Sequence, residues 1–357
     1  MAEACLKTRS PTSFLHKTRT IAAAHPYLAT ATAVVSALAV TALANRHLAK
    51  RAAHDNPPLG RFLMIDGVRL HFVDRGTGEA LVLLHGNGSM IQDFDSSGLI
   101  DLAAKNYRVI VFDRPGFGHS TRPHKVTWTP AAQAELVRKA LHRLGISRAV
   151  VLGHSWGASV AVALALKYPD LVSGLVLASG HYYPTARADV LALSVPALPW
   201  AGDVIRHTVS PIAGRIIWPA LMSKIFGPPT MPKKFGAFPK EMAVRPSQIG
   251  ASAAEAALMV PNAFAFKDQY AKLKMPVSII AGEKDRLIDI DEQSRRLHAE
   301  VAQSRFHSVR GHGHMVHQTA TNSVMSAIDE IFQGCAVGVD GKRKDVSRPS
   351  CPRSEEL

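Results

Sequence analysis

Ser155 is the residue of this 357-residue chain that is best placed to act as a nucleophile. It lies at the centre of a G-x-S-x-G sequence, residues 153–157, between a short apolar run at 149–152 and a helical stretch at 158–168. This strand-turn-helix context predicts a tight turn that holds a serine hydroxyl above the end of a sheet. Gly153 and Gly157 remove side chains where strand and helix approach each other. The context favours a catalytic Ser155 over an incidental serine in a turn.

A serine hydroxyl becomes a strong nucleophile only when a neighbouring base accepts its proton. Histidine suits this role because its pKa lies near neutrality. Among seventeen histidines, His314 is the predicted base, because it follows the last predicted strand and Gly313 lets its loop approach closely. His312 and His317 are the neighbouring alternatives.

A carboxylate must hold the imidazole of such a base in the correct tautomer. Asp285 is the predicted acid, because it follows the strand at residues 276–281, directly after an irregular segment. Glu283 and Asp291 are alternatives nearby. The resulting chain order of serine, acid and histidine is the order expected when the nucleophile sits on a turn of this type.

The oxyanion formed during acyl transfer needs backbone N–H donors close to the nucleophile. The residue after the nucleophile, Trp156, supplies one predicted donor, and Asn87, in the loop at 85–88, supplies the other. Three apolar side chains are predicted to line the substrate pocket, although they could equally belong to the core: Met90, Phe94 and Met315.

Repeated strands must bring these residues together. Two apolar runs that flank Asp66-Gly67 predict a β-hairpin. Five later runs are predominantly apolar, as strands of a buried parallel sheet are, and the first is continuously so: 80–84, 107–112, 149–152, 171–177 and 276–281. The fold class is therefore α/β, with a doubly wound, mostly parallel sheet. Because ligands bind beyond the carboxyl ends of such strands, the candidate residues are expected to converge there.

The alternation of predicted strands and helices is interrupted between residues 181 and 271. This segment is predicted to form a helical cap inserted into a core of residues 57–180 and 272–333. The cap carries nine Lys/Arg against five Asp/Glu. A solvated basic face is preferred over recognition of an anionic substrate. A cap of this kind would shape the pocket and exclude water.

The amino-terminal segment, residues 1–56, contains an uncharged stretch between Arg19 and Arg46, most apolar at 27–44. This length can cross a bilayer as a single membrane anchor. A cleaved signal peptide, which would lead to export, is the main alternative, and a helix lying on the membrane surface is the third. Residues 47–60 are expected to form a linker, and residues 334–357 a disordered tail.

The net charge is +14, but no nucleic-acid-binding motif accompanies it, so the predicted partner of the basic residues is an anionic membrane surface and not nucleic acid. Cys5, Cys335 and Cys351 provide neither a disulfide framework nor a metal-binding spacing. No metal and no cofactor are therefore expected.

Together, the motifs at residues 85–88, 113–120, 153–157, 282–285 and 311–314 resemble those of the α/β-hydrolase superfamily. The resemblance covers about residues 61–333 and implies a cofactor-free hydrolase with a Ser155–His314–Asp285 triad and a mobile cap. The sequence is most similar to the capped group that includes haloalkane dehalogenases, epoxide hydrolases and cofactor-free haloperoxidases. The first two use an aspartate nucleophile, so Ser155 argues against their chemistry and favours ester hydrolysis.

The leading hypothesis is thus a serine hydrolase that cleaves a carboxylic ester of a fairly apolar small molecule through an acyl-enzyme. The same residues could instead hydrolyse a carbon–carbon bond or an amide, or catalyse perhydrolysis. A non-catalytic protein that binds its ligand under the cap is the alternative from a different functional class.

Overall fold

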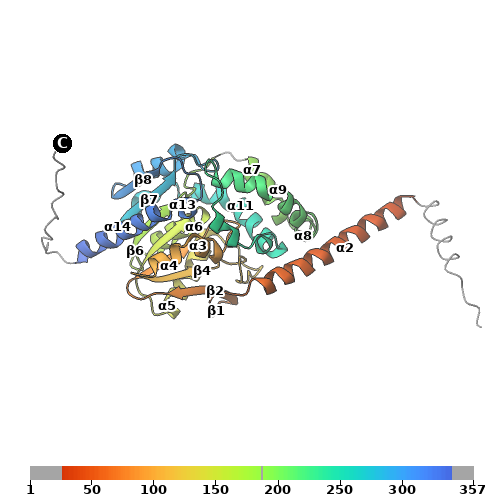
Figure 1. Cartoon of the computed structure of the whole chain (residues 1–357), viewed down its shortest axis with the longest axis horizontal. Coiled ribbons are helices and arrows are strands. Elements are labelled where there is room, and N and C mark those ends of the chain that lie inside the picture. The colour runs from red at the N-terminus through yellow and green to blue at the C-terminus, as the bar shows by residue number, and fades with distance from the viewer. Residues whose placement is uncertain (1–25, 186–187, 340–357) are drawn as a thin grey trace, which may run out of the picture.

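A computed structural model describes residues 26–185 and 188–339 of the chain. Its centre is an eight-stranded sheet with the strand order β1-β2-β4-β3-β5-β6-β7-β8 (Figure 1). β1 pairs antiparallel with β2, and β2 with β4, whereas every other pairing is parallel. The strands are β1 (Arg61–Ile65), β2 (Val68–Arg75), β3 (Ala80–Leu84), β4 (Arg108–Phe112), β5 (Ala149–His154), β6 (Val172–Ala178), β7 (Val277–Gly282) and β8 (Ser304–Val309). This confirms the predicted fold class.

Helices cover both faces of the sheet and connect its parallel strands. Those of the core are α3 (Ile91–Ser97), α4 (Leu99–Ala103), α5 (Pro130–Arg143), α6 (Trp156–Lys167), η4 (Asp291–Arg295), α12 (Arg296–Glu300), α13 (Val316–Thr319) and α14 (Thr321–Val339). Alternate strand residues enter two separate cores. Val82 and Val151 pack with α5 and α6, and Leu83 and Leu152 pack with α3, α4 and α14. Burial on both faces explains why these strands are predominantly apolar.

The predicted hairpin turn is confirmed, and the first helix after β4 with a side-chain cap is α5. Asp66 and Gly67 both have positive φ, 50° and 77°, which is the conformation of a tight turn between two hairpin strands. Thr129 caps α5 by accepting a hydrogen bond from the N–H of Ala132 at 3.2 Å, and Pro130 follows in the first turn.

Between β6 and β7 the chain forms the helices of the predicted cap, which lie beside α2 in Figure 1. They are α7 (Ala188–Ser194), η1 (Val195–Ala197), α8 (Ala201–His207), α9 (Val209–Phe226), η2 (Lys233–Ala237), α10 (Lys240–Ala243), α11 (Pro246–Phe266) and η3 (Tyr270–Lys272). α11 hydrogen-bonds to the loop after β3, since Asn87 Nδ2 donates to the carbonyl of Ser252 at 3.1 Å. The cap therefore covers the carboxyl end of the sheet.

The amino-terminal apolar stretch forms α2 (Pro26–Asp55), which projects from the body (Figure 1). The expected linker at residues 47–60 is wrong over most of its length, because the helix continues to Asp55. Alanine, lysine and arginine favour helix there, and Ala52 is buried against the cap. The expected disordered tail is likewise wrong for residues 334–339, which continue α14, whereas residues 1–25 and 340–357 lie outside the described part.

Two helices of the described residues are long and apolar enough to cross a membrane. One is the stretch Tyr27–Asp55 of α2, and no residue of its most apolar section is buried in the protein. The other is α11, which packs within the cap and carries a buried Glu255. The position of α11 over the sheet identifies it as a core helix, so α2 alone has the surroundings of a membrane anchor or a signal sequence.

Candidate active site

Ser155 lies at the junction of β5 and α6 in a strained backbone conformation. Its φ of 52° and ψ of −119° belong to a region that residues with a side chain rarely adopt. The N–H of Ser155 donates to the carbonyl of Ala178 on β6 at 2.9 Å, which holds the turn against the sheet. A Cβ at Gly153 would approach the Gly157 carbonyl oxygen to 2.3 Å, and one at Gly157 would approach that of Leu84 to 2.1 Å. Both glycines are thus required by close backbone contacts.

His314 and Asp285 form a buried pair beyond the ends of β8 and β7. His314 Nδ1 lies 2.7 Å from Asp285 Oδ2, and the two side chains are 6% and 2% exposed. Because a carboxylate only accepts, Nδ1 carries the hydrogen and Nε2 is left as an acceptor. The other carboxylate oxygen, Oδ1, accepts the N–H groups of Leu287 and Ile288 at 2.8 and 3.0 Å. These contacts fix the orientation of the imidazole.

The alternative acids and bases have other partners. Glu283 accepts a hydrogen bond from Ser308 at 3.1 Å, and Asp291 pairs with Arg295 on the surface. His317 pairs with Asp93, as described below. Within residues 26–185 and 188–339, His312 forms no ion pair with a carboxylate. Geometry therefore favours Asp285 and His314 as the acid–base pair.

The residue before the serine links the two parts of the site. His154 Nε2 donates to the backbone carbonyl of His314 at 3.1 Å, and the two rings lie 5.0 Å apart. On the other side, a Cβ at Gly86 would lie 3.2 Å from the Cβ of Ser155. The described residues include no hydrogen bond between Ser155 Oγ and His314, and such bonds often form only when substrate is present.

The two residues predicted to supply oxyanion donors, Trp156 and Asn87, lie next to Ser155 and in the neighbouring loop after β3. Trp156 is the first residue of α6, so its N–H has no carbonyl partner within the helix. Asn87 follows β3 in the loop that passes beside Ser155, and its side chain is held by Ser252 of the cap. The backbone N–H of Asn87 is thus the predicted donor, while its side chain connects the loop to the cap.

A buried ion pair joins the cap to this loop. Arg114 and Glu255 are 1% and 0% exposed and pair through two guanidinium nitrogens. Arg114 also donates to the carbonyls of His85 and Gly86, both at 2.8 Å. Its backbone N–H donates to His85 Nε2, and burial, together with the Arg114 charge, lowers the pKa of His85 to about 3. A neutral His85 and a paired Arg114 therefore brace the loop at residues 85–88, and the contribution of Arg114 was not predicted from the sequence.

Replacing Glu255 with glutamine is expected to lower the free energy of unfolding by about 3–5 kcal/mol, because it leaves the buried Arg114 charge uncompensated. Denaturant titration monitored by circular dichroism measures this. Asp291→Asn is the matched control, since it breaks an exposed pair and should cost less than about 1 kcal/mol. Equal effects of the two changes would contradict the account.

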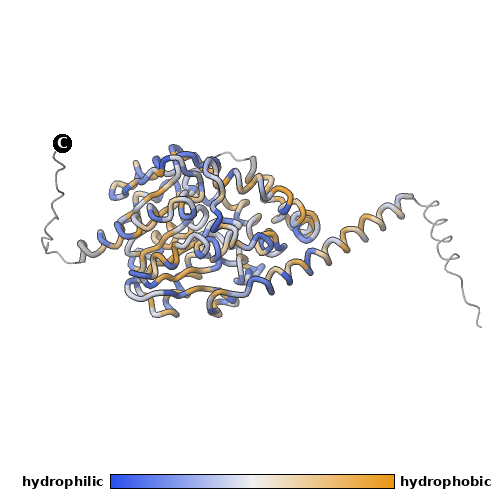
Figure 2. The backbone as a smooth tube through the Cα atoms, in the orientation of Figure 1, coloured by the Kyte–Doolittle hydropathy of each residue, from blue (hydrophilic) through white to orange (hydrophobic). Residues whose placement is uncertain are grey.

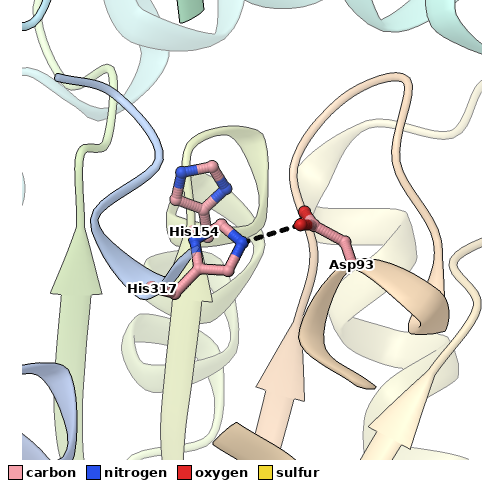
Figure 3. A group of neighbouring side chains, drawn as sticks. All are labelled: Asp93, His154 and His317. Atoms are coloured by element: carbon pink, nitrogen blue, oxygen red, sulfur yellow. Dashed lines mark hydrogen bonds and ion pairs between the residues drawn. The ribbon is translucent and has the colours of Figure 1, made fainter. Parts of the chain in front are cut away.

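A second buried cluster lies behind the serine turn, formed by Asp93, His154 and His317 (Figure 3). One potential ligand atom from each residue lies within 4.8 Å of the other two. Two histidines and a carboxylate at this spacing could hold a metal ion. His317 Nε2 donates to Asp93 Oδ1 at 2.9 Å, and Asp93 also accepts from Ser89 at 2.8 Å and Gln318 at 3.0 Å. The cluster is thus already hydrogen-bonded internally.

The electrostatics of this cluster fit an ionised carboxylate and a neutral His154. Burial opposes ionisation of Asp93, but the charge and hydrogen bond of His317 lower the pKa of Asp93 overall. Burial, followed by the charges of His317 and His314, lowers the pKa of His154 well below its ordinary value. His154 therefore stays neutral and supports the His314 main chain.

Removing metal ions is expected to leave this protein unchanged, because the Asp93 carboxylate and the Nε2 atoms of His154 and His317 are hydrogen-bonded to protein groups, and only the Nδ1 atoms of the two histidines lack a partner. Dialysis against a strong chelator should alter neither the thermal unfolding midpoint nor the rate of hydrolysis. A loss of either that zinc restores would instead identify the cluster as a metal site.

The predicted pocket residues separate into two groups. Met90 and Met315 belong to one buried apolar cluster, here called the cap cluster, together with Ala52, Met222, Phe226, Phe235, Phe238 and Met242. Phe94 instead packs in the core beneath the sheet, with its ring 5.1 Å from that of His317. A cavity of about 460 Å³ opens beside the end of α9 and is lined by Met222 and by Arg286, the residue after Asp285.

Comparisons with known proteins agree with this architecture. The 2-hydroxymuconate semialdehyde hydrolase of Pseudomonas sp. (strain CF600) is 33% identical over 127 residues, which are 35% of this chain and 45% of that enzyme. The chain thus aligns with less than half of that relative. The enol-lactonase of Burkholderia xenovorans LB400 superimposes with a TM-score of 0.64 at 19% identity, covering 76% of this chain and 99% of the lactonase.

A membrane phospholipase A, described as a bacterial virulence factor, superimposes with a TM-score of 0.62 at 18% identity over 91% of this chain and 98% of the phospholipase. These structural similarities establish the shared fold. A family model for the alpha/beta hydrolase fold matches residues 79–321, more than half of the chain. The resemblance inferred from the motifs is confirmed: the chain belongs to the α/β hydrolase fold family and is a hydrolase.

Proposed function

We propose that this hydrolase cleaves a carboxylic ester through an acyl-enzyme, with Ser155, His314 and Asp285 as its catalytic triad. One observation carries the proposal: the residue before the strained Ser155, His154, hydrogen-bonds to the main chain of His314, and His314 Nδ1 is 2.7 Å from a buried carboxylate. A nucleophile, a base and an orienting acid are the groups that activate a serine hydroxyl. No bound metal is needed for this chemistry.

In the proposed reaction, His314 Nε2 accepts the proton of Ser155 Oγ as this oxygen attacks the ester carbonyl. Asp285 holds the imidazole in place and stabilises the imidazolium that forms. The tetrahedral intermediate collapses as the imidazolium returns its proton to the leaving alkoxide. Water then attacks the acyl-serine by the same route, which releases the acid and regenerates the hydroxyl.

The amides of Trp156 and Asn87 would stabilise the negative charge on the carbonyl oxygen. The His85 and Arg114 contacts support this role, because they brace the loop that carries Asn87. Met90 and Met315 would contact the acyl group, since they flank the site from the apolar cap cluster. An apolar acyl substrate suits such surroundings.

A second candidate substrate is 2-hydroxymuconate semialdehyde, the compound named in the relative that is 33% identical over 127 residues. The same three residues could also hydrolyse a carbon–carbon bond or an amide, or catalyse perhydrolysis, in which hydrogen peroxide takes the place of water. The apolar cap cluster favours an acyl ester over this polar semialdehyde.

We also propose that α2 attaches the protein to a membrane as a single helix. The stretch from Tyr27 onward has the length and hydropathy of a span, and basic residues follow it at Arg46, Lys50 and Arg51. The buried contacts of α2 with the cap begin at Asn45, so they would remain after a cut behind Ala44, and sequencing the amino terminus of the mature protein distinguishes a retained anchor from a removed signal.

A panel of p-nitrophenyl esters with acyl chains of increasing length tests the ester assignment. We expect hydrolysis of every short member and a higher kcat/KM for the more apolar acyl groups. The semialdehyde and a matched anilide are included to compare bond types. Turnover of the semialdehyde with none of any ester would overturn the proposal.

A further inference from the structure

Exposed apolar side chains are concentrated in two places on this molecule. Of twenty-four large hydrophobic residues that are exposed in the described chain, seven lie on α2 and thirteen on the cap, leaving four on the rest. In Figure 2 the cap helices beside α2 form a hydrophobic edge of the body. Soluble monomeric proteins rarely expose so many apolar side chains in one region. The exposed surface of the cap helices therefore has the composition of an interaction surface.

The polarity of α2 fixes where a bilayer would end along this helix. Residues 27–44 carry no charge, and eighteen helical residues extend about 27 Å, close to the roughly 30 Å of a hydrocarbon core. Arg46 follows two residues later. If α2 spans the bilayer, one membrane surface therefore lies near Asn45.

Asn45 is also the residue that fastens α2 to the cap. Its side chain is 3% exposed, and its Nδ2 donates to the carbonyls of His207 and Thr208 at 3.0 and 2.8 Å. These two carbonyls lie where α8 ends and α9 begins. The junction of α8 and α9 is consequently held at the level of the membrane surface.

The side chains around this junction suit the interface of a bilayer. Trp200, before α8, is 87% exposed, and Ile216 on α9 is 73% exposed. Val204, Val209 and Ile212 are also exposed. Tryptophan is enriched at membrane interfaces, and branched aliphatic side chains insert just below the headgroups.

The charges on these two helices do not oppose such contact. Arg206 pairs with Asp203 within α8, and Arg215 of α9 pairs with Glu241. Pairing reduces the cost of bringing charges close to the apolar layer, and Lys and Arg can extend toward headgroups. Lys224 is exposed at the other end of α9, away from the junction of α8 and α9.

The opposite side of α9 leads to the catalytic residues. Met222 and Phe226 are buried in the cap cluster, which contains Met315, the residue after His314. The same helix thus has one apolar side facing outward and another that reaches the site.

We propose that α8 and α9 dock in the interfacial layer of the bilayer that α2 enters, and that the substrate is an acyl lipid residing in that bilayer. The proposal rests on the α2 anchor and on ester hydrolysis as proposed above, and it adds a second membrane contact and a substrate class.

Trp200 provides an intrinsic probe, because two of the other three tryptophans, Trp128 and Trp156, are buried and Trp218 is partly buried. The full-length protein is reconstituted in phosphatidylcholine vesicles with and without brominated acyl chains. Brominated lipid is expected to quench the fluorescence, and Trp200→Phe should remove most of that quenching. Equal quenching in both proteins, with Trp200 open to aqueous acrylamide, would overturn docking of the cap.

Vesicle flotation separates this result from failure of the anchor. Protein that does not float with vesicles would overturn both membrane proposals, whereas flotation without quenching of Trp200 overturns cap docking alone. Hydrolysis of a soluble short-chain ester is measured on the same samples, so that loss of catalysis is recognised independently.

A second test concerns the substrate. Ile212→Glu/Ile216→Glu is expected to lower hydrolysis of a vesicle-borne phospholipid or acylglycerol about tenfold, while hydrolysis of the soluble ester stays unchanged. Val126→Glu is the matched control, because Val126 is exposed but lies away from the cap. A double variant that retains full activity on vesicles would contradict the proposal.

Discussion

Ser155→Ala is expected to lower kcat for ester hydrolysis by about 10⁴–10⁶-fold, because it removes the nucleophile on which both half-reactions depend. The elbow backbone should survive the change, since alanine retains the Cβ and the strained turn is held by Gly153, Gly157 and the Ala178 carbonyl. Steady-state hydrolysis of a short-chain ester, with circular dichroism to verify folding, measures the effect.

Ser159→Ala is the matched control for this variant. Ser159 lies one turn further along α6, is buried, and contacts the His181 carbonyl at only 3.4 Å. We expect its kcat to stay within a few-fold of the wild type. A Ser155→Ala protein that turned over at a similar rate would show that another group performs the attack.

Asp285→Asn should lower kcat by about 10⁴-fold with little change in stability. The amide preserves the shape of the carboxylate, but it can donate its own hydrogen to His314 Nδ1 and so favour the wrong tautomer. His314 Nε2 would then carry a proton and could not accept the one from Ser155. Steady-state kinetics at neutral pH and above measure the loss.

Glu283→Gln is the control for the choice of acid. Glu283 lies two residues before Asp285 but contacts Ser308 on β8 instead of the histidine. Near wild-type kinetics are expected for it. The reverse outcome, with Glu283→Gln inactive and Asp285→Asn active, would place the orienting acid at Glu283.

The elements that position the site were predictable because each has a local cause. Ser155 is marked by glycines that its turn requires, and Asp285 and His314 follow apolar runs that could only be buried strands. Parallel strands place their carboxyl ends at one edge, so chain order alone brought these three positions together.

The supporting contacts were not predictable, because they join residues far apart in the sequence. Arg114 and Glu255 are separated by 141 positions, and nothing local indicates that both charges are buried. Asp93 and His317 are separated by 224 positions. Their pairing depends on how α3 and α13 pack, which periodicity does not specify.

The end of α2 was mispredicted for a related reason. The charged residues after Arg46 resembled a solvated linker, but the sequence gives no sign that Ala52 and Asn45 meet the cap. Tertiary packing extends the helix, and the same packing ties the anchor to the cap.

Active-site labelling with a fluorophosphonate, followed by mass spectrometry of the digested protein, tests the central claim most directly. A fluorophosphonate reacts with a serine only when a neighbouring base activates it. We predict one covalent adduct, located on Ser155, and none in the Ser155→Ala protein. An adduct on another residue, or labelling that persists in that variant, would contradict the assignment of Ser155 as the nucleophile.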